Sequence, residues 1–441
     1  MATALGAVGR AARNIRLRQR ARALNNRLFL LTFYLLLLAS GAYLSYGPRV
    51  ALDSKILGVE VGGLRPQQAA TLLEQAWTKY TPVKAQVRDS TLVLSAAETG
   101  FQPDCRGSAS AASSWLWWAK APVHDIKGSF DDAAVSKLAQ RIDAGLPKPK
   151  DAKLVIEADI PRIVPSSDGL MFDSSQWKQA VTACFLAGGT NLKATLVVQR
   201  PQTTTEAIEA MRIRGLLSSY TTKYVEDGAR SNNIRLAASR MSGAMLAPGE
   251  RLSFNDRVGP RTEELGYREA HVFIGDRIED DFGGGVCQVS TTLYNSLFMA
   301  GLEILERSSH SMTVDYVPLG RDAAVAYGLV DLAFRNTTAG HVLIVAETKP
   351  GFITFKVFGD GPDHRVTVES TILTKTDFKV EIVPDPTLPL GQKEVTPGKV
   401  GYRVVAYKIV WDGQKEVSRA VLNYSNYKPM KQVVKEGTKP L

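Results

Sequence analysis

One cysteine in this sequence follows a glycine turn and opens a helical pattern. Glycines 283–285 lead into Val286 and then Cys287, and apolar residues then recur every four positions, the spacing of one helix face. Free backbone N–H groups and the positive end of the helix dipole favour a thiolate at such a position. His310 and Asp322 follow downstream. Because a cysteine, a histidine and an acid are the groups of an activated thiol nucleophile, we predict a catalytic site of these three residues.

An alternative interpretation of the same residues needs no chemistry. A lone cysteine is often a small, buried apolar residue, and clustered glycines often serve only a tight turn. In that case Cys287 belongs to the core, and the chain binds or scaffolds rather than catalyses.

The residues around this cysteine resemble the VanW family, over about residues 231–344. Four motifs carry the resemblance: GGGVCQVSTTLYN at 283–295, LAPGERLSFND at 246–256, VGPRT at 258–262 and DLAFRN at 331–336. The family takes its name from glycopeptide-resistance clusters, so the resemblance implies work on the bacterial cell wall. Some members are proposed to be cysteine L,D-transpeptidases, which join peptidoglycan stem peptides. The resemblance maps the active thiol onto Cys287 and the supporting histidine onto His310, whereas Asp322 is added from its position.

Four polar residues are candidates for substrate binding. Gln288 could help an adjacent backbone N–H polarise a carbonyl, and we also assign Ser290 to the substrate. Arg321 and Arg335 could hold a stem-peptide carboxylate. Three further polar residues of the motifs could line the cleft or only form turns: Ser253, Asn255 and Arg261.

The sequence predicts neither a metal site nor a cofactor. Its five histidines are scattered, and it contains neither a CxxC nor an HxxxH pair. The odd count of three cysteines means at least one free thiol or an intermolecular bond in a protein outside the cell. Cys184 falls on a helical stripe and is predicted to be core, whereas Cys105 lies in a loop-like run. A disulfide between these two remains open.

The positive charge of the chain is concentrated in an N-terminal tail. The formal net charge is +10, and residues 1–50 contain eight arginines and no acid, so the rest carries +10 − 8 = +2. A basic tail is not a binding face, and we therefore expect no nucleic acid partner. Residues 28–46 contain no charge and, at about 1.5 Å per residue, would span roughly 28 Å, about the hydrocarbon thickness of a bilayer.

The arginines before this apolar stretch predict its orientation. They place residues 1–27 in the cytosol and make residues 28–46 a single transmembrane anchor in the cell membrane, with the body extracytoplasmic. A cleaved signal peptide, cut near Ala39-Ser40-Gly41, is the alternative.

The patterns after the anchor predict an α+β fold class in three domains. Residues 52–202 alternate short strands with amphipathic helices, and their opening, GVEVGGLRPQQAATLL, resembles a peptidoglycan-binding domain that precedes VanW or transpeptidase domains. Residues 206–360 form the VanW domain, also α+β, in which alternating apolar residues at 312–316 predict a strand.

Residues 365–441 are predicted to be all-β. Glycines at turn positions along them resemble the five-glycine domain of wall-associated proteins, for which amino-sugar binding is proposed. These are Gly391, Gly398, Gly401, Gly413 and Gly437. Glycines in β-turns need no ligand, so glycan contact stays open.

Together these observations predict a membrane-attached protein that acts on peptidoglycan. The Cys287 thiolate would attack the carbonyl after the third stem residue and release the terminal D-residue, and an amine of a second stem would resolve the thioester while His310 moves the protons. Two alternatives remain: a non-catalytic peptidoglycan-binding scaffold, and a cysteine peptidase of the wall. Transferase and hydrolase differ in water exclusion and acceptor binding, which the sequence does not fix.

Overall fold

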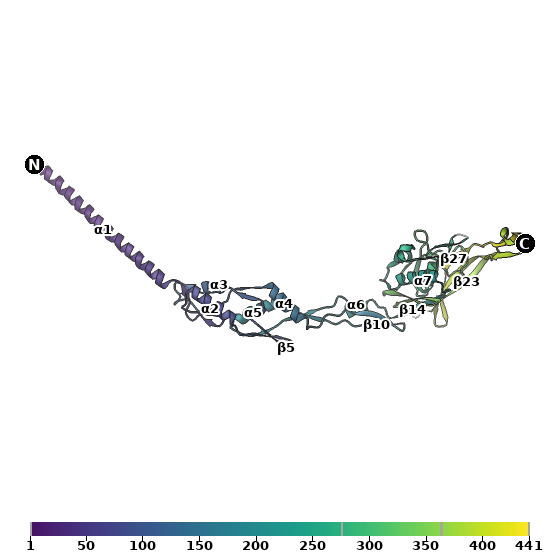
Figure 1. The fold of residues 1–441 in the computed structure, drawn as a ribbon, viewed down its shortest axis with the longest axis horizontal. Coiled ribbons are helices and arrows are strands. Elements are labelled where there is room, and N and C mark those ends of the chain that lie inside the picture. Colours follow the sequence, from purple (N-terminus) through teal and green to yellow (C-terminus); the bar gives the residue numbers. More distant parts are fainter. Residues whose placement is uncertain (1, 275–276, 362–364, 440–441) are drawn as a thin grey trace. The chain divides into compact units, whose positions relative to one another are not determined.

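A computed structural model describes the chain except for residues 1, 275–276, 362–364 and 440–441 (Figure 1). It divides into two compact units. The first contains residues 1–150 and 168–200, and the second contains residues 151–167 and 201–441.

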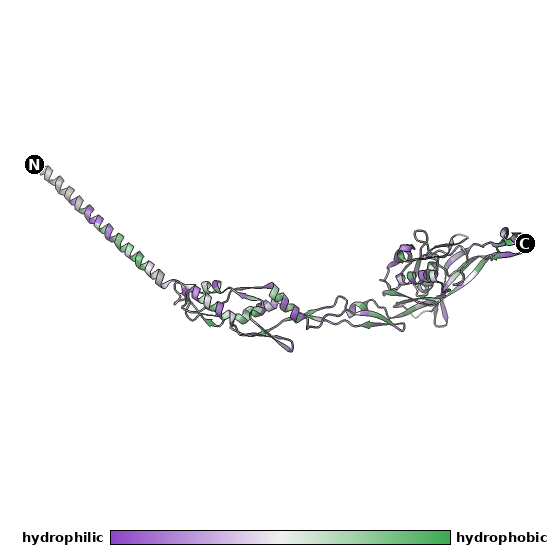
Figure 2. Cartoon of the chain, in the orientation of Figure 1, coloured by the Kyte–Doolittle hydropathy of each residue, from purple (hydrophilic) through white to green (hydrophobic). Residues whose placement is uncertain are grey.

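The chain begins with one long helix, α1 (Ala2–Tyr46). Its segment Leu17–Gly41 is long and apolar enough to cross a membrane, a test that a signal sequence also passes. Figure 2 shows this apolar stretch in green, preceded by hydrophilic turns. The predicted apolar helix is therefore present, and it extends back through the basic tail.

The rest of the first unit packs small sheets against helices. The helices are α2 (Pro66–Thr78), α3 (Cys105–Ala111), α4 (Asp132–Asp143) and α5 (Ser174–Leu186), with a 3-10 turn at Ala97–Thr99. One sheet places β4 (Val83–Val87) between β5 (Ser90–Leu94) and β12 (Asn191–Lys193), which runs parallel to β4. The remaining strands pair as β1 (Arg49–Val50) with β7 (Ser113–Ser114), β2 (Lys55–Ile56) with β3 (Val59–Glu60), β6 (Phe101–Pro103) with β8 (Gly128–Phe130), and β11 (Gly169–Phe172) with β13 (Leu196–Gln199).

Aromatic side chains fill the core of this unit. Trp177 is fully buried, and its indole N–H donates to the Thr99 carbonyl at 3.0 Å. Phe185 lies edge-on to Trp77, with ring centroids 5.2 Å apart. This burial explains why the helices could be predicted from their apolar spacing.

Two cysteines of the first unit are free thiols. The sequence predicted a loop at Cys105, but this residue is the buried first residue of α3. The preceding Asp104 caps the helix by accepting from the Gly107 N–H at 2.8 Å. Cys184 is half-buried on α5 against the core. The two cysteines form no disulfide.

A hairpin from within residues 52–202 belongs to the second unit instead. It consists of β9 (Lys153–Glu157) and β10 (Ile160–Val164), and α6 (Thr205–Ala210) lies beside it. At its turn, Asp159 forms an ion pair with Lys356 at 2.6 Å.

The second unit is built around an antiparallel sheet and a buried helix. The sheet order is β14 (Gly215–Lys223), β22 (Phe352–Gly359), β21 (Val342–Lys349) and β15 (Ala244–Leu246). The helices are α7 (Gly228–Met241), α8 (Phe254–Val258) and α9 (Val286–Met299), with a 3-10 turn at Glu263–Leu265. A smaller sheet orders β16 (Arg251–Ser253), β20 (Ala333–Arg335) and β19 (Glu303–Glu306), and β17 (Glu269–Ile274) pairs with β18 (Arg277–Phe282).

Helix α9 is buried on its polar side as well as on its apolar side. The Thr291 side chain accepts from the Ala323 N–H at 2.9 Å, and the Asn295 amide donates to the Arg321 carbonyl at 2.8 Å. These bonds fix the segment that carries Asp322 onto the helix that carries Cys287. The polar residues of α9 therefore position the candidate site.

The strand predicted at residues 312–316 is wrong. Met312 and Val314 are buried as an alternating pattern requires, but the segment forms bends. Single hydrogen bonds from C-terminal residues, and not a ladder, contact this segment. The Lys428 N–H donates to the Ser311 carbonyl at 2.6 Å, and the Lys399 ammonium donates to the Thr313 carbonyl at 3.0 Å. Alternate burial arises here without a strand pair.

The C-terminal region is all-β, as predicted, which completes the α+β fold class. One sheet orders β23 (Arg365–Thr376), β26 (Gly401–Asp412) and β27 (Lys415–Tyr427), and the other β24 (Val380–Pro389), β28 (Gln432–Lys439) and β25 (Lys393–Thr396).

The five predicted glycines serve two different purposes. Gly391 and Gly413 occupy turns with φ of +92° and +58°. Gly437 instead lies inside β28, where an added Cβ would come within 2.0 Å of the Pro389 carbonyl oxygen. The turn prediction is wrong for this residue, because close approach of two backbones excludes a side chain there.

Candidate active site

The glycine turn before Cys287 is fixed by close packing. Gly285 caps α9 with φ of +104°, and an added Cβ would lie 2.9 Å from Ile234. At Gly284, a Cβ would meet the Ala270 carbonyl oxygen at 2.7 Å. The buried Asn233 amide on α7 donates to the Gly284 carbonyl at 3.1 Å. The turn therefore presents Cys287 in the first turn of α9 in a single backbone arrangement.

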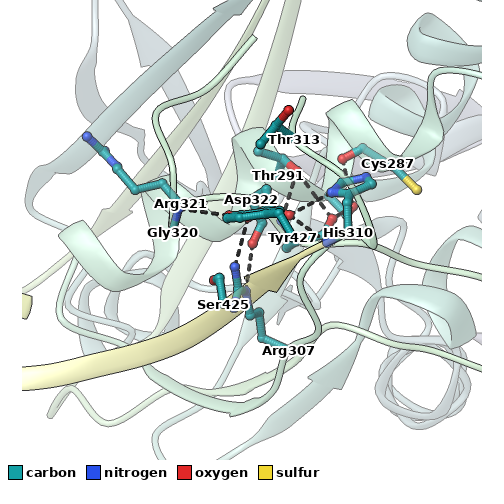
Figure 3. A network of polar contacts seen from close by, with 12 residues as sticks. Cys287, Thr291, Arg307, His310, Thr313, Gly320, Arg321, Asp322, Ser425 and Tyr427 are labelled. Carbon is teal, nitrogen blue, oxygen red and sulfur yellow. Dashed lines mark hydrogen bonds and ion pairs between the residues drawn. The ribbon is translucent and has the colours of Figure 1, made fainter. Parts of the chain in front are cut away.

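The structure brings Cys287, His310 and Asp322 together (Figure 3). Asp322 Oδ2 accepts from the His310 backbone N–H and lies 2.7 Å from His310 Nδ1. His310 also lies close enough to the Cys287 sulfur to act on the charge of the thiol, and the thiol itself donates to the Val325 carbonyl at 3.3 Å. The acid thus orients an imidazole that lies beside the thiol.

The electrostatics of this chain favour a thiolate–imidazolium pair. Burial opposes the charged imidazolium, but its hydrogen bonds to Asp322 and Cys287 prevail and raise the pKa of His310 to about 9. Burial also opposes the thiolate, yet the hydrogen bond and charge of His310 lower the pKa of the Cys287 thiol below its ordinary value. The Val325 N–H, 3.5 Å from Sγ, adds a donor to the thiolate. The sulfur is therefore activated by its partners.

Asp322 is held as a charged group by two further side chains. Arg307 donates through Nη2 to Asp322 Oδ1 at 3.0 Å, and the Tyr427 hydroxyl donates to the same oxygen. Burial disfavours the carboxylate, but His310 and Arg307 outweigh it and lower the pKa of Asp322 to about 2. Tyr427 comes from β27, so the C-terminal sheet contributes directly to the support of this acid.

A cleft of about 470 Å³ opens beside the thiol. Cys287 and His310 line it together with Tyr316, whose ring lies edge-on to the imidazole, with centroids 6.5 Å apart. Burial raises the pKa of Tyr316 well above its ordinary value. Arg230 and Arg261 line the same cleft. A substrate in this cleft would meet the sulfur, the imidazole and two cations.

Two stretches of the chain match known protein families. Residues 229–358 match the VanW like protein family, and residues 365–439 match the G5 domain. The uncharacterized protein YoaR of Bacillus subtilis is 38% identical over 143 residues, which are 32% of this chain and 47% of YoaR. The vancomycin B-type resistance protein VanW of Enterococcus faecalis is 31% identical over 111 residues, 24% of this chain and 40% of that protein.

This chain is a VanW family protein with a C-terminal G5 domain. It aligns with less than half the length of either relative. Among solved structures, the G5 domain of an IgA1 protease is similar at 33% identity, covering 18% of this chain and 95% of that one with a TM-score of 0.13. The HP0197-G5 structure is similar at 22% identity, covering 17% and 99%, with a TM-score of 0.11. The VanW family and the G5 domain suggest a cell-wall associated protein.

The residues that we predicted to bind substrate in the VanW domain lie in different places. Gln288 lines the cleft, but its amide is used internally, accepting from Arg230 at 3.0 Å and donating to the Lys223 carbonyl at 2.9 Å. Ser290 is fully buried and donates to the Ala323 carbonyl at 2.7 Å.

The two arginines predicted to hold a carboxylate do not line the cleft. Arg321 stacks on Tyr220 at 4.9 Å and donates to the Asn295 side chain at 2.8 Å. Arg335 reaches Glu303 on the neighbouring strand, 3.4 Å away. Both guanidinium groups therefore contact residues outside the lining of this cleft.

The other polar motif residues divide between structure and cleft. The Ser253 hydroxyl donates to Asp331, and the Asn255 N–H donates to the same carboxylate at 2.9 Å, so both organise the start of α8. Arg261, in contrast, lines the cleft. Within the described residues, no group of three or more His, Cys, Asp or Glu side chains could hold a metal ion.

Sequence reasoning missed several residues of the VanW site. Arg230 lies one turn into α7, and Tyr316 sits in the segment that was predicted to be a strand. Arg307 and Tyr427 support Asp322 from positions 15 and 105 residues away. No local signal marks such long-range partners, although an arginine close to the histidine, as Arg307 is to His310, could have been considered.

Proposed function

We propose that this chain is a cysteine L,D-transpeptidase that acts on the stem peptides of peptidoglycan. One observation supports the proposal above all: the Cys287 thiol lines a cleft together with an imidazole that a buried carboxylate orients. These are the parts of an activated thiol nucleophile in the order that the chemistry requires.

In the first half-reaction, the Cys287 thiolate attacks the carbonyl of the third stem residue and forms a C–S bond. The carbonyl oxygen takes up negative charge and needs donors. In the first turn of α9, the N–H groups of Val286 and Gln288 already donate to Gly283 and Gly285, each at 3.0 Å. We assign the Cys287 N–H to the oxyanion.

Collapse of this adduct breaks the C–N bond to the terminal D-residue. The His310 imidazolium gives its proton to the leaving amine, which departs as a neutral amine and leaves a thioester on Cys287. Asp322 remains ionised throughout and stabilises the imidazolium before the transfer.

In the second half-reaction, an amine of a second stem attacks the thioester. The neutral His310 takes the amine proton, a new C–N bond forms, the C–S bond breaks and the thiolate returns. If water enters in place of the amine, the same steps produce a peptidase. The transferase differs from the hydrolase only in what the cleft admits at this stage.

The N-terminal helix and the C-terminal G5 domain support a proposal about where the protein lies in the cell. We propose that α1 is a retained single-pass anchor in the cell membrane, with the basic residues 1–27 in the cytosol and the body outside. The G5 domain would hold the body against wall glycan. A reporter fused after Leu441 that is active only in the cytosol would contradict this topology, and a mature form that starts near Gly41 would identify a signal peptide instead.

The reaction is tested by mass spectrometry of the full chain, purified in detergent and incubated with tetrapeptide-stem fragments. We expect an acyl adduct on Cys287 that is one terminal residue lighter than the donor. Cys287→Ala should abolish it with little loss of packing, and His310→Ala should slow it by about 10² to 10⁴. The half-buried Cys184→Ala is the matched control and should leave it unchanged.

Other outcomes identify the alternatives. No adduct, together with normal wall crosslinking in cells that carry Cys287→Ala, would favour a non-catalytic scaffold. An adduct that is only hydrolysed when an acceptor stem is supplied would favour a peptidase.

A further inference from the structure

Two arginines of the cleft lack an acidic partner. Arg230 donates through Nη2 to the Gln288 side-chain oxygen at 3.0 Å, and Arg261 donates through Nη1 to the Gly259 carbonyl at 2.9 Å. Among the side chains that the structure describes, no carboxylate forms an ion pair with either guanidinium. The second guanidinium nitrogen of Arg261, Nη2, is buried and has no hydrogen-bond partner there. Burying a cation without a carboxylate partner is unfavourable in free energy, and such an arrangement is typical of a site that binds an anionic ligand.

One carboxylate, that of Asp331, lies near Arg261 but is committed elsewhere. It is close enough to act on the charge of Arg261. Its oxygens accept from the Ser253 hydroxyl and from the N–H groups of Asn255 and Leu332, the last two at 2.9 and 2.8 Å. Asp331 therefore organises the start of α8 and forms no ion pair with Arg261, whose other charged neighbour is the Cys287 sulfur in its thiolate form.

The surroundings of Arg261 hold its side chain in place. The guanidinium carbon lies 5.6 Å from the centre of the Phe254 ring and 5.8 Å from that of Tyr327. Gly283, directly before the nucleophile turn, leaves the space that the stem of Arg261 occupies, because an added Cβ would lie 2.7 Å from Arg261 Cγ. Two aromatic rings and the space left by a glycine thus fix the position of the Arg261 side chain. A cation that only faced solvent would not need such packing.

Arg230 is held just as firmly. The Gln288 amide that accepts from it donates to the Thr222 hydroxyl at 3.1 Å and to the Lys223 carbonyl at 2.9 Å, so the oxygen of the amide can face only Arg230. Gln288 follows the nucleophile directly in α9. The second arginine is thereby tied to the same turn of helix as the sulfur.

We propose that Arg261 and Arg230 form an anion subsite that binds the free carboxylate of the residue leaving the donor peptide. The choice of this carboxylate rests on the proposed function. In a stem peptide, the terminal carboxylate is one residue beyond the attacked carbonyl, a separation of about 3.8 Å between successive Cα atoms, so both fit in one cleft. A planar guanidinium pairs with a carboxylate through two parallel hydrogen bonds. Such a subsite restricts the attack to the last peptide bond of the chain.

The anion subsite can be tested without any peptide. Iodoacetate and iodoacetamide alkylate a thiolate by the same displacement of iodide. Iodoacetate carries a negatively charged carboxylate, whereas iodoacetamide carries a neutral amide in its place. We expect Cys287 of the full chain to favour iodoacetate, measured as the ratio of the two rates at the Cys287 peptide by mass spectrometry. Arg261→Gln should lower this ratio by about tenfold or more, the size of a hydrogen bond to a charged group. Any change in the reactivity of the thiol itself affects both reagents and cancels in the ratio.

Matched variants separate the subsite from general charge. Arg261→Lys should keep part of the preference, because the charge remains while the planar fork is lost, and Arg230→Gln should lower the ratio independently. Arg335→Gln, which changes an exposed side chain of β20 in the same domain, should leave it unchanged. Thermal unfolding of each variant shows whether the fold is retained. A ratio unchanged in both Arg261→Gln and Arg230→Gln would overturn the proposal.

Donor peptides test which carboxylate is bound. Stem tetrapeptides with a terminal carboxylate should react with a lower KM than those with a terminal carboxamide, and Arg261→Gln should remove this difference. A preference that survives in the variant would overturn the assignment of the terminal carboxylate. If neither donor reacts while Arg261→Gln still abolishes the iodoacetate preference, the transpeptidase proposal fails and the anion subsite stands.

Discussion

Replacing Tyr427 with phenylalanine would remove one hydroxyl from the buried support of Asp322. That hydroxyl donates to Asp322 Oδ1 and accepts from the Gly320 N–H at 2.8 Å. Burial, followed by the nearby charge of Asp322, raises the pKa of Tyr427, so the group stays a neutral donor at any ordinary pH. Tyr427→Phe keeps the ring and its packing and changes only these two hydrogen bonds.

The expected magnitude follows from these two contacts. A hydrogen bond to a charged group is worth about 1.5 to 3 kcal/mol, and the Gly320 N–H would also lose its acceptor, so we expect the free energy of unfolding to fall by about 2 to 3 kcal/mol. The effect on the thiol should be smaller. Arg307 and His310 still hold the carboxylate, so Asp322 stays ionised near neutral pH and the thiolate should lose no more than about tenfold in reactivity at pH 6.

Two assays measure the two effects: urea unfolding for stability, and the rate of Cys287 alkylation by iodoacetamide at pH 6. The matched control is Tyr424→Phe, on the same strand, whose side chain is 69% exposed. Tyr427→Phe should differ from it in both assays. If the two variants unfold at the same urea concentration and alkylate at the same rate, the hydroxyl does not support the acid and the reasoning is refuted.

Three further predictions concern pH and packing. Because the pKa of Cys287 is lowered while burial raises that of Cys105, iodoacetamide at pH 6 should label Cys287 first, and equal labelling would contradict the activated thiolate. The pKa of His310 is about 9 in the folded protein and 6.5 ordinarily, so its contribution to stability is complete below about pH 6.5 and is lost as the pH rises through 9. The pKa of Asp322 is about 2 in the folded protein and 3.8 ordinarily, so its contribution is complete above about pH 4 and is lost as the pH falls through 2. The pair should therefore contribute about 2 to 3 kcal/mol between pH 4 and 6.5, and urea midpoints that do not fall on either side would refute this. Gly437→Ala should cost about 1 to 3 kcal/mol or more, because its Cβ meets the Pro389 carbonyl, whereas Gly215→Ala, with open space, should unfold close to the wild type.

The parts of the fold that could be predicted are those in which the local pattern decides the structure. The apolar spacing after Cys287 predicts α9, and the burial of that face confirms why: the residues pack under the main sheet of the second unit. The same holds for α2 and for the C-terminal strands. In each case one face of a single element carries enough apolar side chains to determine its type.

The parts that could not be predicted depend on partners distant in sequence. Residues 312–316 alternate in burial, yet no strand among the residues that the structure describes pairs with them. Arg321 was a reasonable candidate for binding a carboxylate on chemistry alone. In the structure its guanidinium stacks on the Tyr220 ring and donates to the Asn295 amide, and both partners lie on other elements. Arg261, for which the sequence left a place in the cleft and a turn both open, lies in the cleft, in the space that Gly283 leaves.

The candidate site crosses a boundary that the sequence draws between two families. Cys287, His310 and Asp322 all lie in the stretch that matches the VanW like protein family, whereas Tyr427 lies in the stretch that matches the G5 domain. Asp322 has one oxygen committed to His310 and the other shared by Arg307 and Tyr427. Since the carboxylate is buried, each donor lost must be replaced by another or its charge becomes more costly. The C-terminal sheet therefore contributes one of the donors that support the acid beside His310.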